Sequence, residues 1–450
     1  MLTSLLSTLV LFAGAGGANG GLPSKEPSAV GMSAARLERI DRIVARAVRA
    51  GGFPGASVVI GRRGASVFER GYGSLTWSKQ TQVVASRTIY DLASLTKVVA
   101  TTTAIMILYD EGRVRLEDPV SKFIPAFSGG AKDDITVQQI LEHRSGLPAG
   151  RELWRTAMTP EEARQAVIES PLECNPGRCY IYSDLGPDIL GFIIEAVSGK
   201  RLDAYLQERV FAPLQMQDTH FRPHWTLRDR IAPTEVTPPR GYPLRGEVHD
   251  ENAFVMGGIA GHAGLFSTAT DLAVFAQMML NGGEYNGVRI VSDSTVNLFT
   301  RNTASRGSRA LGWDTCEHDG SCGKYLSTNA YGHTGFTGTS LWIDPDRDLF
   351  VILLTNRVHA ARVRRPAKVI ADIRADVADA AALSVRDANG QLKVMPASFR
   401  ADRAAGWNRP IRSRSSRSRR SKASTRPKAV KPAPKKPVVP APTVTVLKSG

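Results

Sequence analysis

The chain lacks the motifs on which the assignment of hydrolases and nucleotide-binding proteins usually rests. It contains no Gly-x-Ser-x-Gly, no His-Glu-x-x-His, no phosphate-binding loop and no Gly-x-Gly-x-x-Gly sequence. Their absence removes the ordinary grounds for an α/β-hydrolase, a zinc protease, a nucleotidase or a Rossmann enzyme. We therefore predict neither a metal ion nor a cofactor.

Acidic residues are almost missing from the C-terminal end. Residues 401–450 contain 14 Lys/Arg and one acidic residue, whereas residues 1–400 contain 44 Lys/Arg and 41 Asp/Glu. The nearly neutral body excludes a fold organised around a basic face for duplex DNA. Because the tail is rich in Pro, Arg and Ser, we expect it to be disordered. We expect the tail either to bind an anionic polymer of the cell envelope or to have no specific partner. We do not expect it to bind a specific nucleic acid.

Long apolar stretches are missing beyond the start of the chain. Residues 1–20 hold a short apolar run followed by small residues, which predicts a signal peptide or an uncleaved N-terminal anchor. No other segment is apolar for the ~20 residues that a transmembrane helix requires.

Cysteine is scarce, with four residues in the chain. Cys174 and Cys179 enclose four residues, and Cys316 and Cys322 enclose five, so we expect each close pair to form a small disulfide loop. A metal site made of Cys316, His318 and Cys322 is the weaker alternative, because these are not the usual zinc spacings. Disulfides and a signal peptide together predict a periplasmic or secreted protein.

Strand patterns occur at both ends of a largely helical chain. Short β-branched runs around a Gly-Arg-Arg-Gly turn predict a hairpin at about 54–73, and more strands are predicted at about 331–356. Helical patterns fill about 94–320. We expect an α/β (α+β) fold over residues 33–385: an antiparallel sheet built from both chain ends and flanked by helices, with an inserted all-α subdomain.

The candidate nucleophile is Ser94, in the sequence Ser94-Leu-Thr-Lys97. Ser-x-x-Lys also occurs at Ser321–Lys324, but there it lies in a Gly-rich loop bounded by cysteine, with no helix behind it. From Leu95 to Tyr109 every residue except Lys97 is uncharged and most are apolar, which predicts a buried helix. On that helix the Lys97 amine lies one turn from the Ser94 hydroxyl.

Burial gives this lysine a chemical role. Because an ammonium near the positive N-terminus of a buried helix is costly, we expect Lys97 to lose its proton easily and to serve as a general base for Ser94. The alternative is a helix-capping serine beside a lysine whose ammonium reaches water.

Two further polar motifs follow in order and favour the catalytic interpretation. Tyr182-Ser-Asp184 begins 88 residues after Ser94, and His333 of Tyr331-Gly-His-Thr-Gly335 lies 151 residues after Tyr182. Side chains two residues apart on a loop can point the same way, and glycines allow a strand edge to come close to a ligand.

With this ordered triple, the sequence resembles the serine β-lactamase and penicillin-binding-protein-like enzymes. It is similar to the branch that contains class C β-lactamases, D-Ala-D-Ala carboxypeptidases and related esterases. The resemblance covers about residues 34–380. Besides the triple, it rests on Tyr90-Asp-Leu-Ala-Ser-Leu-Thr-Lys97, Glu117-Asp-Pro-Val-Ser, Ile140-Leu-Glu-His-Arg-Ser-Gly-Leu147, Pro213-Leu-Gln-Met-Gln-Asp-Thr219 and Gly261-His-Ala-Gly-Leu-Phe-Ser-Thr-Ala-Thr-Asp-Leu272.

The resemblance implies a serine hydrolase that forms an acyl-enzyme. Ser94 would attack a carbonyl, while Lys97 and Tyr182 would take and return protons. The backbone N–H groups of Ser94 and Phe336 would hold the oxyanion. Whether Lys97 or a Tyr182 phenolate is the resting base stays open, because their titrations are coupled.

Two departures from the family pattern bear on the substrate, which by resemblance lies along His333, Thr334 and Gly335. Asp184 stands where Asn is common, and an ionised carboxylate only accepts, so we expect it to hold the Lys97 ammonium. His333 replaces the lysine usual in class C β-lactamases and is only partly charged near neutral pH, so it anchors a substrate carboxylate more weakly.

Both departures argue against an efficient β-lactamase and favour a D-Ala-D-Ala carboxypeptidase acting on peptidoglycan peptides. A carboxylesterase of the same fold, acting on a small molecule, is the first alternative. A catalytically silent envelope-binding protein is the second.

Four other polar residues give weaker signals. His262, in a Gly-rich stretch, either borders the pocket or packs a loop. Asp250 and Asn252 either contact substrate or cap a local turn, and His143 is expected to end a helix.

Overall fold

The computed structural model describes residues 21–301, 309–316, 320–359, 366–386 and 388–407. Contacts divide the chain into residues 1–409 and 410–450. The predicted signal peptide, His318 and most of the predicted basic tail lie outside the described residues.

The main sheet joins the two ends of the chain. Its strands run in the order β2-β1-β11-β10-β9-β8, and all pairs are antiparallel. β1 lies beside β11, with Ala56 opposite Thr355. The predicted antiparallel sheet is therefore confirmed, and its strands are β1 (Gly55–Arg62), β2 (Ala65–Gly73), β8 (Asp314–Thr315), β9 (Tyr331–Thr334), β10 (Ser340–Asp344) and β11 (Leu349–Thr355).

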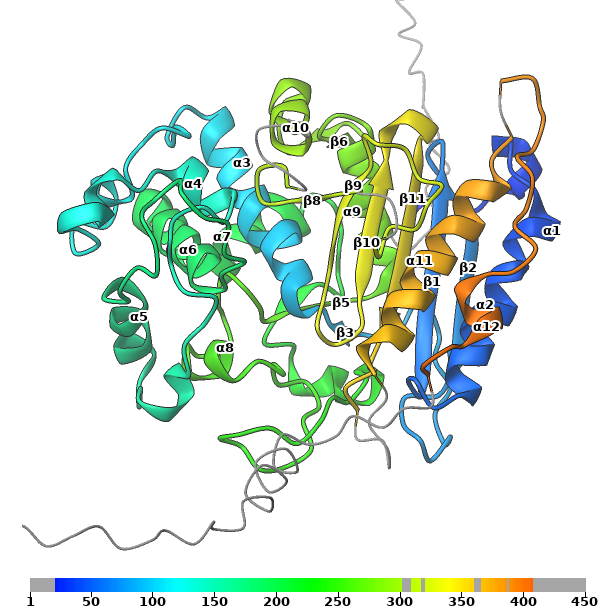
Figure 1. The fold of residues 1–450 in the computed structure, drawn as a ribbon, viewed down its shortest axis with the longest axis horizontal. Helices are drawn as coiled ribbons and strands as arrows, with labels where there is room; N and C mark the ends of the chain where they lie inside the picture. Colours follow the sequence, from blue (N-terminus) through cyan, green and yellow to red (C-terminus); the bar gives the residue numbers. More distant parts are fainter. Residues whose placement is uncertain (1–20, 302–308, 317–319, 360–365, 387, 408–450) are drawn as a thin grey trace, which may run out of the picture. The chain divides into compact units, whose positions relative to one another are not determined.

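Alternating side chains divide the core between the two faces of the sheet. Val58 and Val351 belong to a core shared with α2 (Arg39–Arg49) and α11 (Ala367–Ser384). Val59 and Ile352 belong to the opposite core, which includes α9 (Ala269–Leu280). Figure 1 shows α11 and α2 along one side of the sheet and the helical region on the other. One more short helix, α1 (Ala34–Leu37), packs beside α11.

The region between the outer strands is mainly helical, as predicted. Its helices are α3 (Thr103–Asp110), α4 (Val137–Leu141), α5 (Pro160–Ile168), α6 (Leu185–Ser198), α7 (Leu202–Leu206), α8 (Glu251–Val255), α9 and α10 (Asp293–Thr300), preceded by the short segments η2 (Ala93–Leu95) and η3 (Lys97–Thr102).

The expectation of an all-α insertion is wrong in one respect, because this region also holds short strands. β8 extends the main sheet, β6 (Glu284–Tyr285) pairs with β7 (Val288–Arg289), and β3 (Tyr90–Asp91), β5 (Leu265–Ser267) and β4 (His220–Phe221) form a small sheet. Strands of two or three residues are too short to show the alternation by which strands are recognised.

The packed body extends beyond the predicted limits of 33–385. Val30 and Met32 are buried at one end, and α12 (Arg400–Arg403) packs on α11 at the other. Trp407 is fully buried and its indole N–H donates to Asp372 Oδ2 at 2.8 Å. The predicted disordered tail therefore begins too early at 401, because the basic composition hides these apolar anchors.

The cysteines pair locally, as expected. Cys174 bonds Cys179 and Cys316 bonds Cys322, with Cα–Cα distances of 6.6 and 5.7 Å. Both sulfurs of the proposed metal alternative are therefore engaged in a disulfide. In the described ranges, no helix has the length and hydropathy to cross a bilayer.

The packing of Trp407 makes a direct prediction about stability. Trp407→Ala removes a buried indole and leaves the Asp372 carboxylate without that donor, so it should lower the free energy of unfolding by about 3–5 kcal/mol. Urea denaturation measures the change. Trp225→Ala is the control, because Trp225 is 76% exposed and should cost little; equal losses for the two variants would contradict burial of Trp407.

Candidate active site

Ser94 lies in a tight turn between β3 and the buried helix that follows. Ala93, just before it, has a φ of 48°, a backbone conformation that L-residues rarely adopt. The Ala93 N–H donates to Asp91 Oδ1 at 2.8 Å, and the other Asp91 oxygen accepts from the His249 N–H at 2.7 Å. The buried Asp91 carboxylate therefore holds the strained turn that presents Ser94.

The end of β9 packs directly against this turn. Thr337 Oγ1 donates to the Asp91 carbonyl at 2.7 Å, and Thr339 Oγ1 donates to the Leu92 carbonyl at 2.9 Å. A Cβ at Gly335 would lie 2.4 Å from the Leu92 carbonyl oxygen and 2.1 Å from Thr339 Oγ1. Gly335 is thus required for the close approach of the strand edge to the Ser94 turn.

Lys97 is buried and its ammonium has three acceptors. It donates to Ser94 Oγ at 2.9 Å and to the His262 carbonyl at 3.2 Å, and it forms an ion pair with Asp184 Oδ1 at 2.7 Å. The Lys97 side chain is 3% exposed. The sequence-based expectation that Asp184 holds this ammonium agrees with the geometry.

The expectation that Lys97 loses its proton easily is wrong. Burial lowers the pKa of Lys97, but the charge and hydrogen bonds of Tyr182 and Asp184 outweigh burial and hold that pKa above its ordinary value. The resemblance placed Asp184 beside the amine, but the 2.7 Å contact and the added contribution of Tyr182, which together outweigh burial, come from the fold. Lys97 is therefore an ammonium at rest.

Tyr182 is placed by the residue that ends α4. His143 has a φ of 55° and its carbonyl accepts from the Ile181 N–H at 3.0 Å, while its Nδ1 accepts from the Ser183 N–H at 3.1 Å. Its ring lies 4.7 Å from the Tyr182 ring, centroid to centroid. Burial, and then the charges of Arg309 and Lys97, hold the pKa of His143 well below its ordinary value.

His333 faces Tyr182 from β9, with ring centroids 6.0 Å apart. Its Nε2 accepts from the Arg309 guanidinium at 3.1 Å and its Nδ1 donates to the Thr334 carbonyl at 2.8 Å. Burial, Arg309 and Lys97 hold the pKa of His333 well below its ordinary value. His333 is therefore neutral rather than partly charged, and Arg309 supplies the positive charge at this position.

These side chains open onto one cavity of about 440 Å³. Phe336, 60% exposed, and Thr334 border it, and Arg357 and Arg374 lie on the same wall as the apolar residues of α11. In the described part of the chain neither of these two arginines forms an ion pair. Burial, and then the charge of Arg357, lower the pKa of Arg374 to about 9. The cavity therefore combines a serine hydroxyl with three guanidinium groups and one carboxylate, Asp314, which pairs with Arg309 at 2.8 Å.

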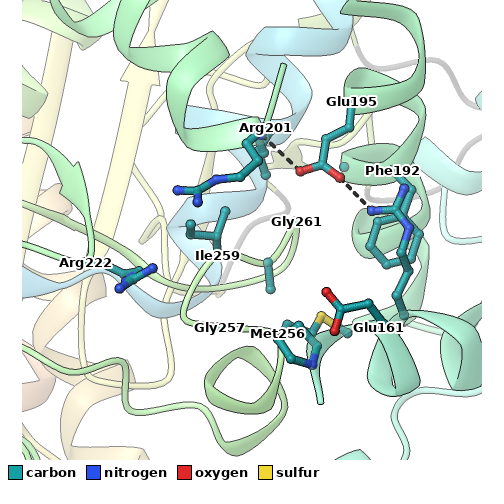
Figure 2. Close-up of a pocket in the computed structure, with 14 residues that line it drawn as sticks. Glu161, Phe192, Glu195, Arg201, Arg222, Met256, Gly257, Ile259 and Gly261 are labelled. Carbon is teal, nitrogen blue, oxygen red and sulfur yellow. Dashed lines mark hydrogen bonds and ion pairs between the residues drawn. The ribbon is translucent and has the colours of Figure 1, made fainter. Parts of the chain in front are cut away.

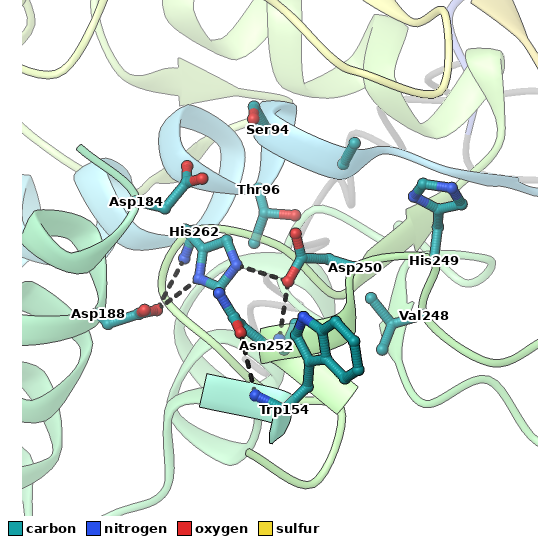
Figure 3. Close-up of polar contacts among 12 residues, drawn as sticks. Ser94, Thr96, Trp154, Asp184, Asp188, Val248, His249, Asp250, Asn252 and His262 are labelled. Carbon is teal, nitrogen blue, oxygen red and sulfur yellow. Dashed lines mark hydrogen bonds and ion pairs between the residues drawn. The ribbon is translucent and has the colours of Figure 1, made fainter. Parts of the chain in front are cut away.

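The weaker candidates form a separate cluster behind Lys97. Figure 3 shows the His262 ring between Asp188 and Asp250. Asp250 also caps α8 by accepting from the Ala253 N–H, and Asn252 Oδ1 accepts from the Trp154 N–H at 3.4 Å. His262 is thus neither a pocket wall nor a simple loop-packing residue.

A second cavity, of about 240 Å³, lies against α5 and α6 (Figure 2). It contains the ion pair of Arg164 with Glu195, at 2.6 Å, and the loop that ends at Gly261 closes it. Its 14 lining residues include no Ser, Thr, Cys, Tyr, His or Lys. It therefore offers none of the nucleophiles found in the first cavity.

Sequence reasoning missed the residues that support the motif side chains. Arg309, Arg374 and Asp188 belong to no motif singled out in the sequence, and only the fold brings them to the site. His143 was expected only to end a helix, and its ring contact with Tyr182 was not predicted. The one available signal was an aspartate inside the apolar run of α6, where a buried carboxylate needs a partner.

Comparison with known proteins places the chain in a family. The family model described as "Beta-lactamase" matches residues 40–375, more than half of the chain. The protein therefore belongs to the beta-lactamase family, whose fold is shared by serine hydrolases with carboxypeptidase, amidase and esterase relatives.

Curated relatives cover most of the same region. The chain is 35% identical over 371 residues to a Bacillus subtilis (strain 168) protein named "N-acetylmuramyl-L-alanine amidase", covering 73% of this chain and 82% of that one. It is 33% identical over 375 residues to an Escherichia coli (strain K12) protein named "Putative D-alanyl-D-alanine carboxypeptidase", covering 75% and 86%.

Solved structures share the fold. A penicillin-binding protein homolog from Caulobacter crescentus aligns with a TM-score of 0.62 and 21% identity, covering 78% of this chain and 99% of that one. EstCE1, described as a hydrolase with promiscuous acyltransferase activity, aligns with a TM-score of 0.61 and 20% identity, covering 77% and 99%.

The contact at Gly335 makes a testable prediction. Gly335→Ala should force the end of β9 away from the Ser94 turn and lower the free energy of unfolding by about 1–3 kcal/mol, the usual cost of overpacking. Thermal or urea denaturation measures the loss. Gly150→Ala is the matched control, since a Cβ there meets no atom within 4 Å. If Gly335→Ala were as stable as Gly150→Ala, the close approach would be wrong.

Proposed function

We propose that the protein is an exported serine hydrolase that cleaves peptidoglycan peptides at D-Ala-D-Ala amides through an acyl-enzyme on Ser94. The observation that carries this proposal is the hydroxyl of Ser94, 2.9 Å from a buried Lys97 ammonium, in a cavity with three guanidinium groups. No water-activating metal is needed, because the serine oxygen is itself the nucleophile.

Lys97 acts in this proposal as a fixed cation and Tyr182 as the proton carrier. The Lys97 Nζ lies 5.2 Å and the Arg309 guanidinium 5.0 Å from the centroid of the Tyr182 ring. In this proposal Tyr182 takes the Ser94 proton in its phenolate form, as Ser94 Oγ bonds to the substrate carbonyl carbon. Tyr182 then gives that proton to the leaving amine as the C–N bond breaks, and water hydrolyses the ester on Ser94.

The oxyanion would be held by the N–H groups of Ser94 and Phe336. Both residues border the cavity, and neither N–H donates to another described group. Unpaired backbone donors beside a nucleophile suit a charge that exists only during the reaction.

The charge of the cavity supports a substrate that ends in a carboxylate. Since His333 is neutral, attraction of that carboxylate falls to Arg309, with Arg374 and Arg357 deeper along the wall. Arginine binds carboxylates through two parallel hydrogen bonds. A D-Ala-D-Ala peptide carries such a group one residue from the scissile amide, whereas a neutral ester does not.

The relatives support the same substrate class and an extracytoplasmic location. Both curated names refer to amides found in peptidoglycan. Periplasmic or secreted action also agrees with the two disulfides, which persist in oxidising compartments.

Cleavage of the muramyl-L-alanine amide is a second candidate, favoured by the Bacillus subtilis relative. An esterase activity is a third, favoured by exposed Phe336 and by Ile370, which give part of the cavity an apolar wall. Incubation with purified peptidoglycan and with short-chain nitrophenyl esters distinguishes the three activities. A D-Ala-D-Ala carboxypeptidase releases free D-Ala, an amidase releases stem peptides with an L-Ala N-terminus, and an esterase releases nitrophenol.

Labelling with a fluorescent penicillin tests the nucleophile. We expect one acyl group per chain, no labelling of Ser94→Ala, and acylation at least about 100-fold slower for Lys97→Ala, because the cation beside the phenolate and serine is lost. Intact mass and peptide mapping identify the acylated residue.

The second Ser-x-x-Lys sequence provides the control. Lys324→Ala should label like the unchanged protein, since Lys324 lies in the loop after Cys322, does not line the Ser94 cavity, and its backbone N–H donates to Asp379. Equal losses for the Lys97 and Lys324 variants, or no acylation by penicillin and activated esters, would refute the proposal.

Arg309 provides a test of substrate class. Arg309→Gln should lower kcat/KM for a peptide ending in D-Ala-D-Ala by ten-fold or more, about 1.4 kcal/mol, because a charge-assisted contact to the carboxylate is lost. Hydrolysis of a neutral nitrophenyl ester should fall much less, and Arg309→Lys should recover part of the peptide activity. Parallel losses on both substrates would show that Arg309 serves only to hold His333.

A further inference from the structure

The His262 imidazole is enclosed by two carboxylates. Its Nδ1 lies 2.8 Å from Asp188 Oδ1 and its Nε2 lies 2.9 Å from Asp250 Oδ1. The backbone N–H of His262 donates to the same Asp188 oxygen at 3.2 Å. The side chains of His262 and Asp188 are 2% and 1% exposed, so water hardly contributes to this arrangement.

This geometry determines the protonation of the ring. A neutral imidazole has one donor nitrogen and one acceptor nitrogen, whereas both His262 nitrogens face carboxyl oxygens, which only accept when ionised. Burial raises the pKa of Asp188, whereas, despite burial, the charge and hydrogen bond of His262 hold the pKa of Asp250 below its ordinary value. The imidazolium is the form that pairs with both groups as carboxylates. The charges of Asp188 and Asp250 outweigh burial and keep the pKa of His262 well above its ordinary value.

The main chain of His262 forms part of the Lys97 site. Its carbonyl accepts from Lys97 Nζ at 3.2 Å, and the preceding carbonyl, of Gly261, accepts from Thr101 Oγ1 at 2.6 Å. The Leu265 N–H donates to Thr96 Oγ1 at 3.2 Å. Three side chains of the helix that carries Lys97 therefore hold the 261–265 loop, and the two carboxylates hold it from behind.

The 261–265 loop has no freedom to adjust. A Cβ at Gly261 would lie 1.9 Å from the Pro187 carbonyl oxygen, so α6 packs against the bare backbone of the loop. That contact is what brings Asp188 onto His262. A change in the charge of His262 therefore acts on Lys97 through space and through its own carbonyl.

We propose that His262, held as an imidazolium between Asp188 and Asp250, is a positioning residue that fixes the Lys97 ammonium and offsets the negative charge behind it. This role rests on the proposed acylation of Ser94, because it sets the pH range in which that reaction proceeds. His262 itself contacts neither Ser94 nor the first cavity's wall.

The sign of the effect follows from the charged groups that face His262. Asp184 and Asp188 lie at the start of α6, Asp250 at the start of α8, and Lys97 on η3. The two cations face three carboxylates, and the Tyr182 phenolate of the proposed function adds a further negative charge beside Lys97. Neutralising His262 makes this site more negative, so the base that takes the Ser94 proton becomes harder to deprotonate and acylation requires a higher pH.

The experiment compares pH profiles of penicillin acylation, measured as a second-order rate constant, for His262→Gln and Asp250→Asn. His262→Gln removes a cation and should move the acidic limb up by about one pH unit; Asp250→Asn removes an anion and should move it down by a similar amount. Asparagine still caps α8, so Asp250→Asn tests the proposal even if His262→Gln does not fold.

A matched control separates charge from packing. Asp271→Asn also neutralises a half-buried carboxylate, which accepts from Thr219 and from the Asp218 N–H, and should leave the acidic limb in place. The proposal would be overturned if the acidic limb of the pH profile did not move in His262→Gln and Asp250→Asn, or moved in the same direction in both. An equal shift in Asp271→Asn would also overturn it.

A second readout does not need activity. In protein labelled with 15N at histidine, both ring N–H groups of His262 should persist two pH units above the ordinary histidine pKa of about 6.5, and vanish in His262→Gln. A single ring N–H would overturn the proposal. An unchanged protein that penicillin does not acylate refutes the proposed function, whereas an acylated protein with unshifted variant profiles refutes only the role of His262.

Discussion

The architecture of the site depends on one ammonium kept out of water. Taking a lysine charge into a protein interior is costly unless an opposite charge and hydrogen bonds replace its hydration. At Lys97 the replacement is complete: Asp184, Ser94 Oγ and the His262 carbonyl accept one donor each. These three groups come from the N-cap of α6, the η2 turn and the 261–265 loop. The requirement to satisfy one cation therefore fixes three separate parts of the chain.

The same requirement extends one layer outward. Asp188 lies one helical turn after Asp184 and faces the same way along α6, so a second carboxylate enters the interior with the first. The His262 imidazolium pairs with Asp188 through Nδ1 and with Asp250 through Nε2. Lys97, Asp184, Asp188, His262 and Asp250 thus form a row of positive and negative charges. Removal of any one of them leaves the charge of its neighbour uncompensated.

Sequence could predict what is local and could not predict what the fold brings together. Short β-branched and apolar runs at Gly55–Ile60 and Leu349–Thr355 indicated strands, and an uncharged helix around Lys97 indicated burial. Ser94, Lys97, Tyr182 and His333 were found as an ordered set of polar motifs, which the family resemblance then supported. The structure brings Ser94, Tyr182 and His333 to one cavity, with Lys97 bonded to Ser94. The charge state of Lys97 was predicted wrongly, because it depends on how close Asp184 lies.

The remaining errors have the same physical origin. The basic composition after residue 400 hid Trp407, whose burial depends on a complementary site on α11. Arg309 gave no signal because one arginine looks like any other until its neighbours are known. Residues whose role is set by distant partners, such as Arg309, His143 and Asp188, are those that a single sequence leaves unassigned.

Charge in the first cavity is divided between two functions. Lys97 is fully engaged by its acceptors and faces the nucleophile, so it has no hydrogen bond left for a substrate carboxylate. His333 cannot carry that charge, because burial and then the charge of Arg309, which donates to its Nε2, hold its pKa well below the ordinary value. In the proposed function, recognition of an anion therefore falls to guanidinium groups, which stay charged at physiological pH. In this proposal, the rate of proton transfer from Ser94 depends on pH through the buried charges around Lys97. Binding of the substrate carboxylate by arginine depends on pH hardly at all.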